Sequence, residues 1–366
     1  MSLPFQVNAS LANLPVYQPG RPVEEVAREL GLDPAGVIKL ASNENSLGPS
    51  PKAVAAMQDA VGRVHEYPDG SAFHLKRLLA ERVGVSLSNL VLGNGSNEVL
   101  EFVAHACISP GSEVVVSQYC FAVYPIVTHL MGGSLVTVPA RDYGHDLGRM
   151  LDAITDRTRV VFVANPNNPT GTHIPADEVE SFLERVPSSV LVVMDEAYIE
   201  YLDDPLDLVP RVRSGEQPNL LLTRTFSKIY GLAGLRLGYG IGAPEVVSVL
   251  EKVRQPFNIN LVAQAGAMAA LDDSEHTEKT RRNNSAEMRW FEQQLGDLSL
   301  VWVPSRANFL LVKVGEGGRV FDRMQRDGVI VRPMGGYGLP EWVRISIGLP
   351  EENQRCLQAL RAALAP

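Results

Sequence analysis

Cysteine is scarce in this sequence, and its pattern excludes two kinds of architecture. The 366 residues contain three cysteines, Cys107, Cys120 and Cys356. An odd number without the spacing of metal ligands indicates reduced thiols rather than a disulfide framework or a metal centre. Cys107 falls in the apolar stretch VLEFVAHACI, so a core position is expected for it. The sequence therefore predicts no metal site.

Long hydrophobic runs and a secretory leader are also missing. No uninterrupted apolar stretch approaches the roughly 20 residues that a membrane-spanning helix needs. Residues 1–25 lack a basic start followed by an apolar core, which is the pattern of a signal peptide. These absences predict a cytoplasmic protein without a membrane segment.

Positive charge is in short supply as well. Lys and Arg together number 33 against 42 Asp and Glu, the formal net charge is −9, and no run of basic residues stands out. This balance argues against a nucleic-acid partner and against an anionic membrane surface. It does not exclude a small anionic ligand, because a single pocket can be basic on an acidic protein. A small molecule is therefore the expected partner.

What the sequence does contain is a regular alternation of short β-branched runs with longer helical patterns, from about residue 50 to residue 270. Several of these runs are apolar throughout, which is typical of strands covered on both faces. The alternation predicts an α/β fold whose large domain has a mostly parallel central sheet flanked by helices. The expected strands are 89–93, 113–117, 134–139, 159–166, 189–197, 219–226 and 236–242.

The rest of the chain predicts a second, smaller α/β domain. A long polar helical stretch, about 262–296, leads into short strands within LVWVPSRANFLLVKV, VIVRPM and WVRISIG, and then into a terminal helical pattern. A length of 366 residues also favours two domains over one core. We divide the chain into an N-terminal segment (1–40, part of the small domain or a substrate lid), a large domain (41–265) and a small domain (266–366).

Polar clusters follow four of the expected strands, at the strand ends where sheets of this kind bind ligands. They are GNGSNE at 93–98, NPNNPTG at 165–171, DEAY at 195–198 and TFSK at 225–228. Each has a plain structural interpretation: a capped helix start, a turn, a helix N-cap and a solvent-exposed lysine. Their combination favours one shared ligand site instead.

Together the clusters meet the requirements of pyridoxal phosphate. This cofactor needs a lysine amine for a Schiff base and an acid beside its ring nitrogen, which Lys228 and Asp195 supply. Tyr198 is placed to hydrogen-bond its phenolic oxygen. Desolvation and neighbouring cations would lower the pKa of such a lysine. The phosphate needs helix N–H groups, hydroxyls and an arginine. The candidates for that cradle are Gly95, Ser96, Asn97, Ser227 and Arg236.

The same residues resemble the fold-type I pyridoxal-phosphate aminotransferases. The resemblance covers nearly the whole chain, from LASNENSLGPSP through EYPDG, NPNNPTG, DEAY and TFSKIYGLAGLRLGY to ANFLLV and VRISIG. It implies that Lys228 is the Schiff-base lysine and proton shuttle, and that Asp195 pairs with the ring nitrogen. It also implies that Asn168 and Tyr198 contact the phenolic oxygen. Phe121 would stack on the ring, where many relatives have a tyrosine.

The resemblance carries expectations about partners and substrate too. In the family, the residue matching Tyr67 of EYPDG reaches the phosphate of the neighbouring subunit's cofactor, which implies a homodimer with shared active sites. Arg332 and Arg344 are expected to face the substrate, because the planar guanidinium binds a carboxylate or phosphate with two hydrogen bonds. Tyr17 would assist them, and Asn45 is expected at the rim of the site.

Within the family, the sequence is most similar to the branch that moves an amino group between glutamate or 2-oxoglutarate and histidinol phosphate or imidazole acetol phosphate. An aromatic amino-acid aminotransferase, acting on phenylalanine or tyrosine, and a threonine-phosphate decarboxylase are the alternatives. A non-catalytic regulator would need a DNA-binding segment, which residues 1–40 are too short and too weakly basic to supply. A nicotinamide enzyme is disfavoured because the third glycine of its fingerprint is missing.

Overall fold

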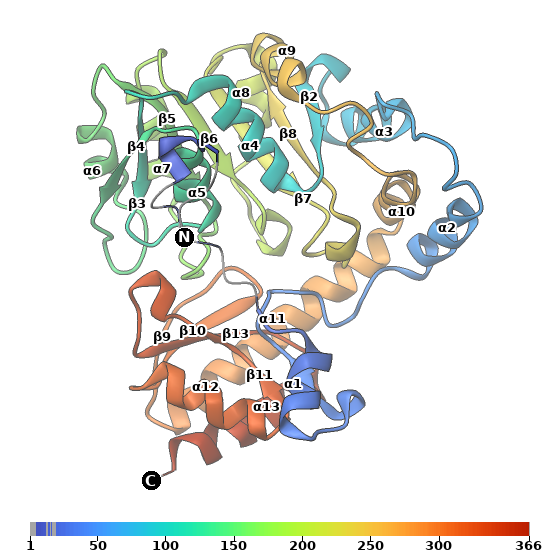
Figure 1. The fold of residues 1–366 in the computed structure, drawn as a ribbon, viewed down its shortest axis with the longest axis vertical. Helices are drawn as coiled ribbons and strands as arrows, with labels where there is room; N and C mark the ends of the chain where they lie inside the picture. Colours follow the sequence, from blue (N-terminus) through green and yellow to red (C-terminus); the bar gives the residue numbers. More distant parts are fainter. Residues whose placement is uncertain (1–4, 12–13, 15, 17–19, 366) are drawn as a thin grey trace.

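A seven-stranded sheet organises the larger part of the molecule (Figure 1). The computed structural model describes residues 5–11, 14, 16 and 20–365. The strand order is β2-β8-β7-β6-β5-β3-β4; β8 runs antiparallel to both of its neighbours, and the other pairs are parallel. The strands are β2 (Leu90–Gly93), β3 (Glu113–Ser117), β4 (Ser134–Val138), β5 (Thr158–Ala164), β6 (Leu191–Asp195), β7 (Leu220–Thr225) and β8 (Gly238–Gly242). The predicted mostly parallel sheet is confirmed.

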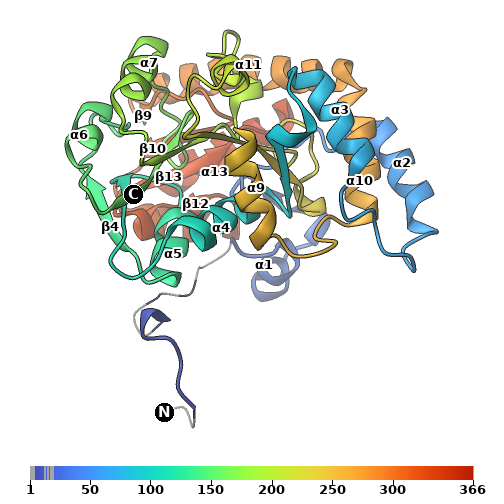
Figure 2. The same cartoon turned by 90° about the horizontal axis from the view of Figure 1, so that it is seen from above.

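Helices cover both faces of this sheet because its central strands are apolar on both sides. Val160 and Phe162 of β5 pack with α4, α5 and α9, whereas Val161 and Val163 pack with α3, α6, α7 and α8. Figure 2 shows α4 and α7 on opposite sides of the sheet. The helices of this part are α2 (Pro51–Val61), α3 (Phe73–Val83), α4 (Ser96–Cys107), α5 (Val123–Leu130), α6 (Leu147–Asp152), α7 (Ala176–Arg185), α8 (Val209–Ser214), α9 (Pro244–Val253) and α10 (Leu261–Leu271).

The smaller part combines the end of the chain with its beginning. An antiparallel sheet has the order β12-β13-β10-β9, and β1 pairs in parallel with β11. Phe291, Leu310, Ile345 and Leu360 form its core together with Leu40. The elements are α1 (Val23–Leu30), β1 (Ile38–Lys39), α11 (Ser274–Asp297), β9 (Val301–Val303), β10 (Phe309–Lys313), α12 (Gly317–Arg326), β11 (Val329–Ile330), β12 (Arg332–Pro333), β13 (Trp342–Ser346) and α13 (Pro350–Leu364). The pairing of β1 and the position of Leu40 agree with the proposed grouping of residues 1–40 with the small domain, although the domain limits stay a prediction.

Short 3-10 helices complete the described structure. They are η1 (Ala9–Leu11), η2 (Pro34–Gly36), η3 (Leu87–Asn89), η4 (Ile199–Tyr201), η5 (Ala233–Leu235) and η6 (Gly335–Tyr337). Within the described ranges, no helix combines the length and the apolar character needed to cross a membrane.

The helical stretch expected at about 262–296 is two helices rather than one. The first, α10, is rich in alanine and packs on α2, while the second, α11, runs between the two parts of the molecule (Figure 1). The break lies at Asp272 and Asp273, where the Asp273 side chain accepts a hydrogen bond from the backbone N–H of His276. An aspartate that caps a new helix start ends the preceding helix, because its side chain competes for the backbone donors.

The parallel arrangement brings several strand ends to one edge of the large sheet. Asp195 closes β6, and Ser227 and Lys228 follow β7. Since β8 runs in the opposite direction, its first residue, Gly238, lies at the same edge and pairs with Gly93. A Cβ atom on Gly238 would overlap the backbone nitrogen of Ser96. Glycine is therefore required for β8 to pass this close to the start of α4.

Replacement of Gly238 by alanine tests that packing. We expect Gly238→Ala to destabilise the protein by about 1–3 kcal/mol, because the added methyl group meets backbone atoms that cannot move independently. Gly318→Ala is the matched control, since a Cβ at Gly318 meets nothing within 4 Å. The midpoints of urea unfolding followed by circular dichroism measure both effects. Equal midpoints for the two variants would show that the close approach is not a constraint.

Candidate active site

A cavity of about 390 Å³ lies at this edge of the sheet, facing the small antiparallel sheet. It brings together residues from both parts of the chain. For the large part, the sequence predicted this from the polar clusters at the strand ends. The predicted site residues that line it are Ser96, Asn97, Phe121, Asn168, Asp195, Tyr198, Ser227, Lys228, Arg236, Arg332 and Arg344.

Lys228 sits in the cavity wall with its amine largely shielded from water. Its Nζ donates to the carbonyl oxygens of Asn43 at 3.3 Å and Ser42 at 3.5 Å. It also lies 5.5 Å from the centre of the Tyr198 ring. Desolvation, followed by the positive charge of Arg344, lowers the pKa of Lys228 from 10.5 to about 8. A lysine with this pKa can exchange a proton near neutral pH.

Asp195 is a carboxylate held deep in the same cavity, with 5% of its surface exposed. Its Oδ2 accepts a hydrogen bond from Tyr124 Oη at 2.7 Å, and its Oδ1 accepts one from Thr223 Oγ1 at 3.2 Å. Burial raises the pKa of Asp195, while these two hydrogen bonds act in the opposite direction. The group is therefore suited to hold a cation that enters the cavity.

Tyr198 is the centre of a polar group on the other side of the cavity. Its Oη accepts from Asn43 Nδ2 at 2.9 Å and from Asn168 Nδ2 at 3.2 Å. Asn168 Oδ1 in turn accepts from Arg344 Nη1 at 2.7 Å. Burial raises the pKa of Tyr198 to about 12, so the hydroxyl keeps its proton at neutral pH. With two bonds accepted, that proton is available for an oxygen of a ligand.

The start of α4 and the segment after β7 form a cradle suited to an anion. The first N–H groups of a helix have no partner within the helix, and the helix dipole favours negative charge there. Gly95, at φ +83°, allows the approach of Arg236, because a Cβ would lie 2.6 Å from Arg236 Nη2. Arg236 itself has φ +57°, a left-handed conformation uncommon for an arginine. Its Nη1 reaches Ser227 Oγ at 3.5 Å.

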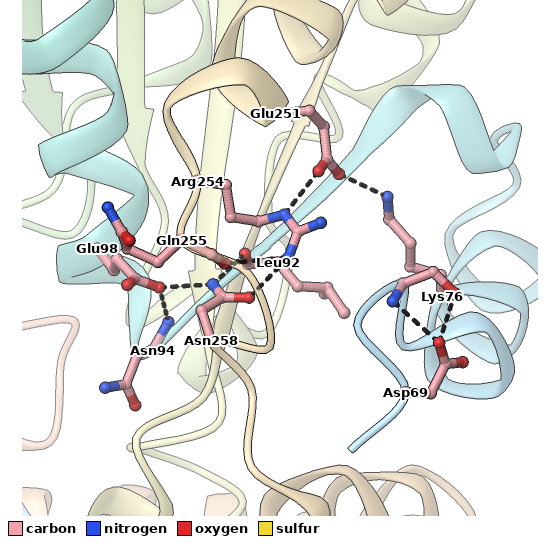
Figure 3. A network of polar contacts seen from close by, with 10 residues as sticks. Asp69, Lys76, Leu92, Asn94, Glu98, Glu251, Arg254, Gln255 and Asn258 are labelled. Atoms are coloured by element: carbon pink, nitrogen blue, oxygen red, sulfur yellow. Dashed lines mark hydrogen bonds and ion pairs between the residues drawn. The ribbon is translucent and has the colours of Figure 1, made fainter. Parts of the chain in front are cut away.

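A network of side chains fixes the loop before α4 in place (Figure 3). Asn258 Nδ2 donates to Glu98 Oε2 at 2.7 Å and to the carbonyl of Leu92 at 3.1 Å. Glu98 also accepts from the backbone N–H of Asn94 at 2.6 Å. Arg254 Nη1 donates to Asn258 Oδ1 at 3.0 Å, which ties the loop to the end of α9. These hydrogen bonds hold the cradle in place and use none of the side chains that line the cavity.

Two arginines of the small sheet also line the cavity. Arg332 and Arg344 are directly paired on β12 and β13. Arg344 is anchored by a bond from Nη2 to the carbonyl of Ala41 at 3.1 Å, and its guanidinium lies 5.2 Å from the centre of the Phe309 ring. Like charges at opposed positions of a sheet repel each other, so an anion between them would be stabilising.

Among the described residues, three predicted ones are not in the lining of the cavity: Gly95, Asn45 and Tyr67. Tyr17 is outside the described residues. Gly95 lies against the Arg236 guanidinium. Asn45 Nδ2 donates to the carbonyl of Ile229 at 3.0 Å. Tyr67 is 83% exposed, and its ring stacks on Phe257 at 4.9 Å. The substrate role of Asn45 and the intersubunit role of Tyr67 stay predictions.

The sequence did not predict Asn43, which lines the cavity, or Tyr124 and Thr223, which donate hydrogen bonds to Asp195. Asn43 stands two positions before Asn45 in the same SNENSLGP segment, and Tyr124 stands three after Phe121. Asn43 adopts φ +54°, and its carbonyl oxygen faces Lys228. Residues near them in the chain were predicted for the site, but contacts between residues far apart in sequence decide which side chain reaches the cavity.

Comparison with known proteins identifies the family. Residues 35–360 match the family model described as aminotransferase class I and II. The chain belongs to this aminotransferase family. Its relatives include a histidinol-phosphate aminotransferase of Akkermansia muciniphila, 51% identical with 100% of both chains covered. Another is histidinol-phosphate aminotransferase 2 of Pseudomonas fluorescens, 54% identical with 95% of each covered.

A solved structure of the same family supports the fold. The histidinol-phosphate aminotransferase of Sinorhizobium meliloti, crystallised in complex with pyridoxal-5'-phosphate, matches with a TM-score of 0.90 and 29% identity over 98% of this chain and 97% of that one. Among residues 5–11, 14, 16 and 20–365, the structure shows no group of three or more His, Cys, Asp or Glu side chains suited to a metal ion.

The lowered pKa of Lys228 predicts how this aminotransferase takes up pyridoxal phosphate. An amine attacks an aldehyde only when it is neutral, and it is neutral above its pKa. The rate at which cofactor-free protein develops a visible absorption band should therefore rise with a midpoint near pH 8 instead of 10.5. Stopped-flow absorbance measures it, with N-acetyl-lysine as the control. A rate that still climbs at about pH 10, as for a free lysine, would contradict the assigned desolvation.

Proposed function

We propose that the chain is a pyridoxal-phosphate-dependent transaminase of histidine biosynthesis. It moves an amino group between glutamate or 2-oxoglutarate and histidinol phosphate or imidazole acetol phosphate. The observation that carries this proposal is one cavity lined by a desolvated amine, a buried carboxylate and two groups of residues suited to bind an anion. The names of the 51% and 54% identical relatives support the choice of substrate.

The residues of the cavity fit pyridoxal phosphate by their chemistry. When bound, this cofactor supplies an aldehyde for the amino group and an electron-withdrawing ring that stabilises negative charge at the substrate α-carbon. Asp195 would accept a hydrogen bond from the protonated ring nitrogen, and Tyr198 and Asn168 would bind the phenolic oxygen. Phe121 would pack on the ring. The phosphate would be held by Ser96, Asn97, Ser227 and Arg236.

Lys228 carries the proton transfer. Its amine, neutral in part at pH 7 to 8, would take a proton from the substrate α-carbon. The resulting ammonium would give that proton to C4′ of the cofactor. A pKa of about 8 suits both directions, because neither the charged nor the neutral amine is strongly disfavoured near neutral pH.

The two arginines explain why one site can serve two unlike substrates. Glutamate carries a carboxylate at the end of its side chain, and histidinol phosphate carries a phosphate. Arg332 and Arg344 offer planar donors that bind either group. Phenylalanine offers only its α-carboxylate, whereas histidinol phosphate offers a doubly charged phosphate to the two arginines. This contrast favours histidinol phosphate over the aromatic amino acids.

A substrate panel tests the proposed function. Purified protein with pyridoxal phosphate should transfer the amino group of histidinol phosphate to 2-oxoglutarate at least about tenfold more efficiently than that of phenylalanine. Lys228→Ala should lower turnover by at least about 10³-fold and remove the visible band. Steady-state assays of glutamate formation measure both. Preference for phenylalanine would favour the aromatic aminotransferase, and carbon dioxide release from threonine phosphate would favour the decarboxylase.

We further propose that two copies of the chain form a homodimer and share their active sites. The support is the position of Tyr67, which is largely exposed yet held by a ring contact with Phe257. In such a dimer Tyr67 would contact the phosphate in the partner's site. We also propose a cytoplasmic location, supported by the three cysteines, which are free thiols.

Mixing two inactive variants tests the shared site. We expect Tyr67→Ala and Lys228→Ala each to be impaired alone. In a mixed dimer, one site would hold both substitutions and the other neither, so mixing should restore about a quarter of wild-type activity. Activity measured after subunit exchange decides the question, with sedimentation to establish dimers. No recovery in verified mixed dimers would place Tyr67 outside the partner's site.

A further inference from the structure

The Asp195 carboxylate depends on a tyrosine that does not line the cavity. We propose that Tyr124 is a positioning residue that keeps Asp195 ionised and aimed at the ring nitrogen of pyridoxal phosphate. Through it, the ring nitrogen keeps its proton during the reaction. This inference rests on the proposed function and adds to it a residue behind the site.

The geometry of Tyr124 supports this role. Tyr124 lies in the first turn of α5 and is completely buried. Its Oη donates to Asp195 Oδ2 at 2.7 Å, an ordinary length for an O–H···O hydrogen bond. The other oxygen, Oδ1, accepts from Thr223, the residue paired with Asp195 across β6 and β7. Both carboxylate oxygens therefore accept hydrogen bonds from residues outside the cavity lining, which fixes the plane of the carboxylate.

The Tyr124 ring has little freedom to move. It stacks on Phe162 with ring centres 4.6 Å apart and planes 5° apart. Phe121, which lines the cavity, meets it edge to face with ring centres 5.7 Å apart. Thr128 Oγ1 donates to its carbonyl oxygen at 2.7 Å. A clamped ring makes its hydroxyl a donor of fixed direction, so the hydrogen bond to Asp195 costs little further ordering.

The charges around Asp195 explain why such a donor is needed. Burial raises the pKa of Asp195, and a neutral carboxyl group could not stabilise a protonated ring nitrogen. The hydrogen bond from Tyr124 is the largest opposing influence, followed by those from Thr223 and from the backbone of Ala197. Burial also holds the pKa of Tyr124 well above 10, so Tyr124 keeps its proton and is the hydrogen-bond donor in this pair.

Nitrogen NMR tests this inference separately from activity. Cofactor-free wild type, Tyr124→Phe, Thr223→Val and Tyr239→Phe are each loaded with pyridoxal phosphate labelled with ¹⁵N at the ring nitrogen. The ¹⁵N chemical shift reports directly whether that nitrogen is protonated. Tyr239→Phe is the matched control, because Tyr239 is a buried tyrosine of β8 that does not line the cavity.

The expected result is a protonated signal in wild type and in Tyr239→Phe, and a shift towards the neutral position in Tyr124→Phe. Thr223→Val should move the signal the same way by less, and it carries the test if Tyr124→Phe fails to fold. For Tyr124→Phe, kcat should fall about tenfold to a hundredfold with a smaller change in KM.

Three other outcomes are informative in distinct ways. A protonated signal in wild type that stays unchanged in both Tyr124→Phe and Thr223→Val would overturn the inference and leave the proposed function intact. An equal shift in Tyr239→Phe would also overturn it, because the effect would then not be specific to Asp195. Failure of wild type to bind the labelled cofactor would instead contradict the proposed function itself.

Discussion

The structure depends on holding an amine and a carboxylate in one cavity that contains little water, without either group serving as the hydrogen-bond partner of the other. Lys228 gives its hydrogen bonds to the backbone carbonyls of Ser42 and Asn43, while Asp195 receives its own from Tyr124 and Thr223. Each group thereby keeps its capacity to act on a ligand. The cost is desolvation, which lowers the pKa of Lys228 and raises that of Asp195. The lowered pKa makes the Lys228 amine more reactive, whereas the raised pKa of Asp195 is opposed by its hydrogen bonds, which keep the carboxylate able to hold a cationic nitrogen.

The larger and smaller parts of the molecule contribute different groups to this cavity. The carboxyl edge of the large sheet supplies Lys228, Asp195 and the start of α4, the groups proposed to react with the cofactor and hold it. The small antiparallel sheet supplies Arg332 and Arg344, and it does so as paired neighbours on adjacent strands. The link between the two parts is itself polar: Arg344 bonds to Asn168, and Asn168 bonds to Tyr198. Two hydrogen bonds therefore link Arg344, proposed to bind the substrate's anion, to the residues proposed around the cofactor ring.

The sequence was sufficient for the fold class and for much of the cavity, for a physical reason. Asp195 and Lys228 each follow a strand that is apolar throughout, and in a parallel sheet such strand ends must converge. Asn43 and Tyr124 gave no comparable signal, because their roles come from partners 155 and 71 positions away. Neighbours of both residues were proposed for the site, and Asn45 proved to be bonded to the Ile229 backbone. The break between α10 and α11 was not predicted, because the helical pattern continues on both sides of Asp273 and only its hydrogen bond to the backbone of His276 marks the new helix start.

The most direct measurement of the central claim is to find where pyridoxal phosphate becomes attached. Borohydride reduction of the protein incubated with the cofactor converts a lysine Schiff base into a stable pyridoxyl-lysine, and peptide mass spectrometry locates it. The chemistry of the cavity predicts one modified site, Lys228, within the segment TFSKIYGLAGLR. Attachment at another lysine, or no attachment while the protein remains folded, would contradict the assignment of this cavity as the active site.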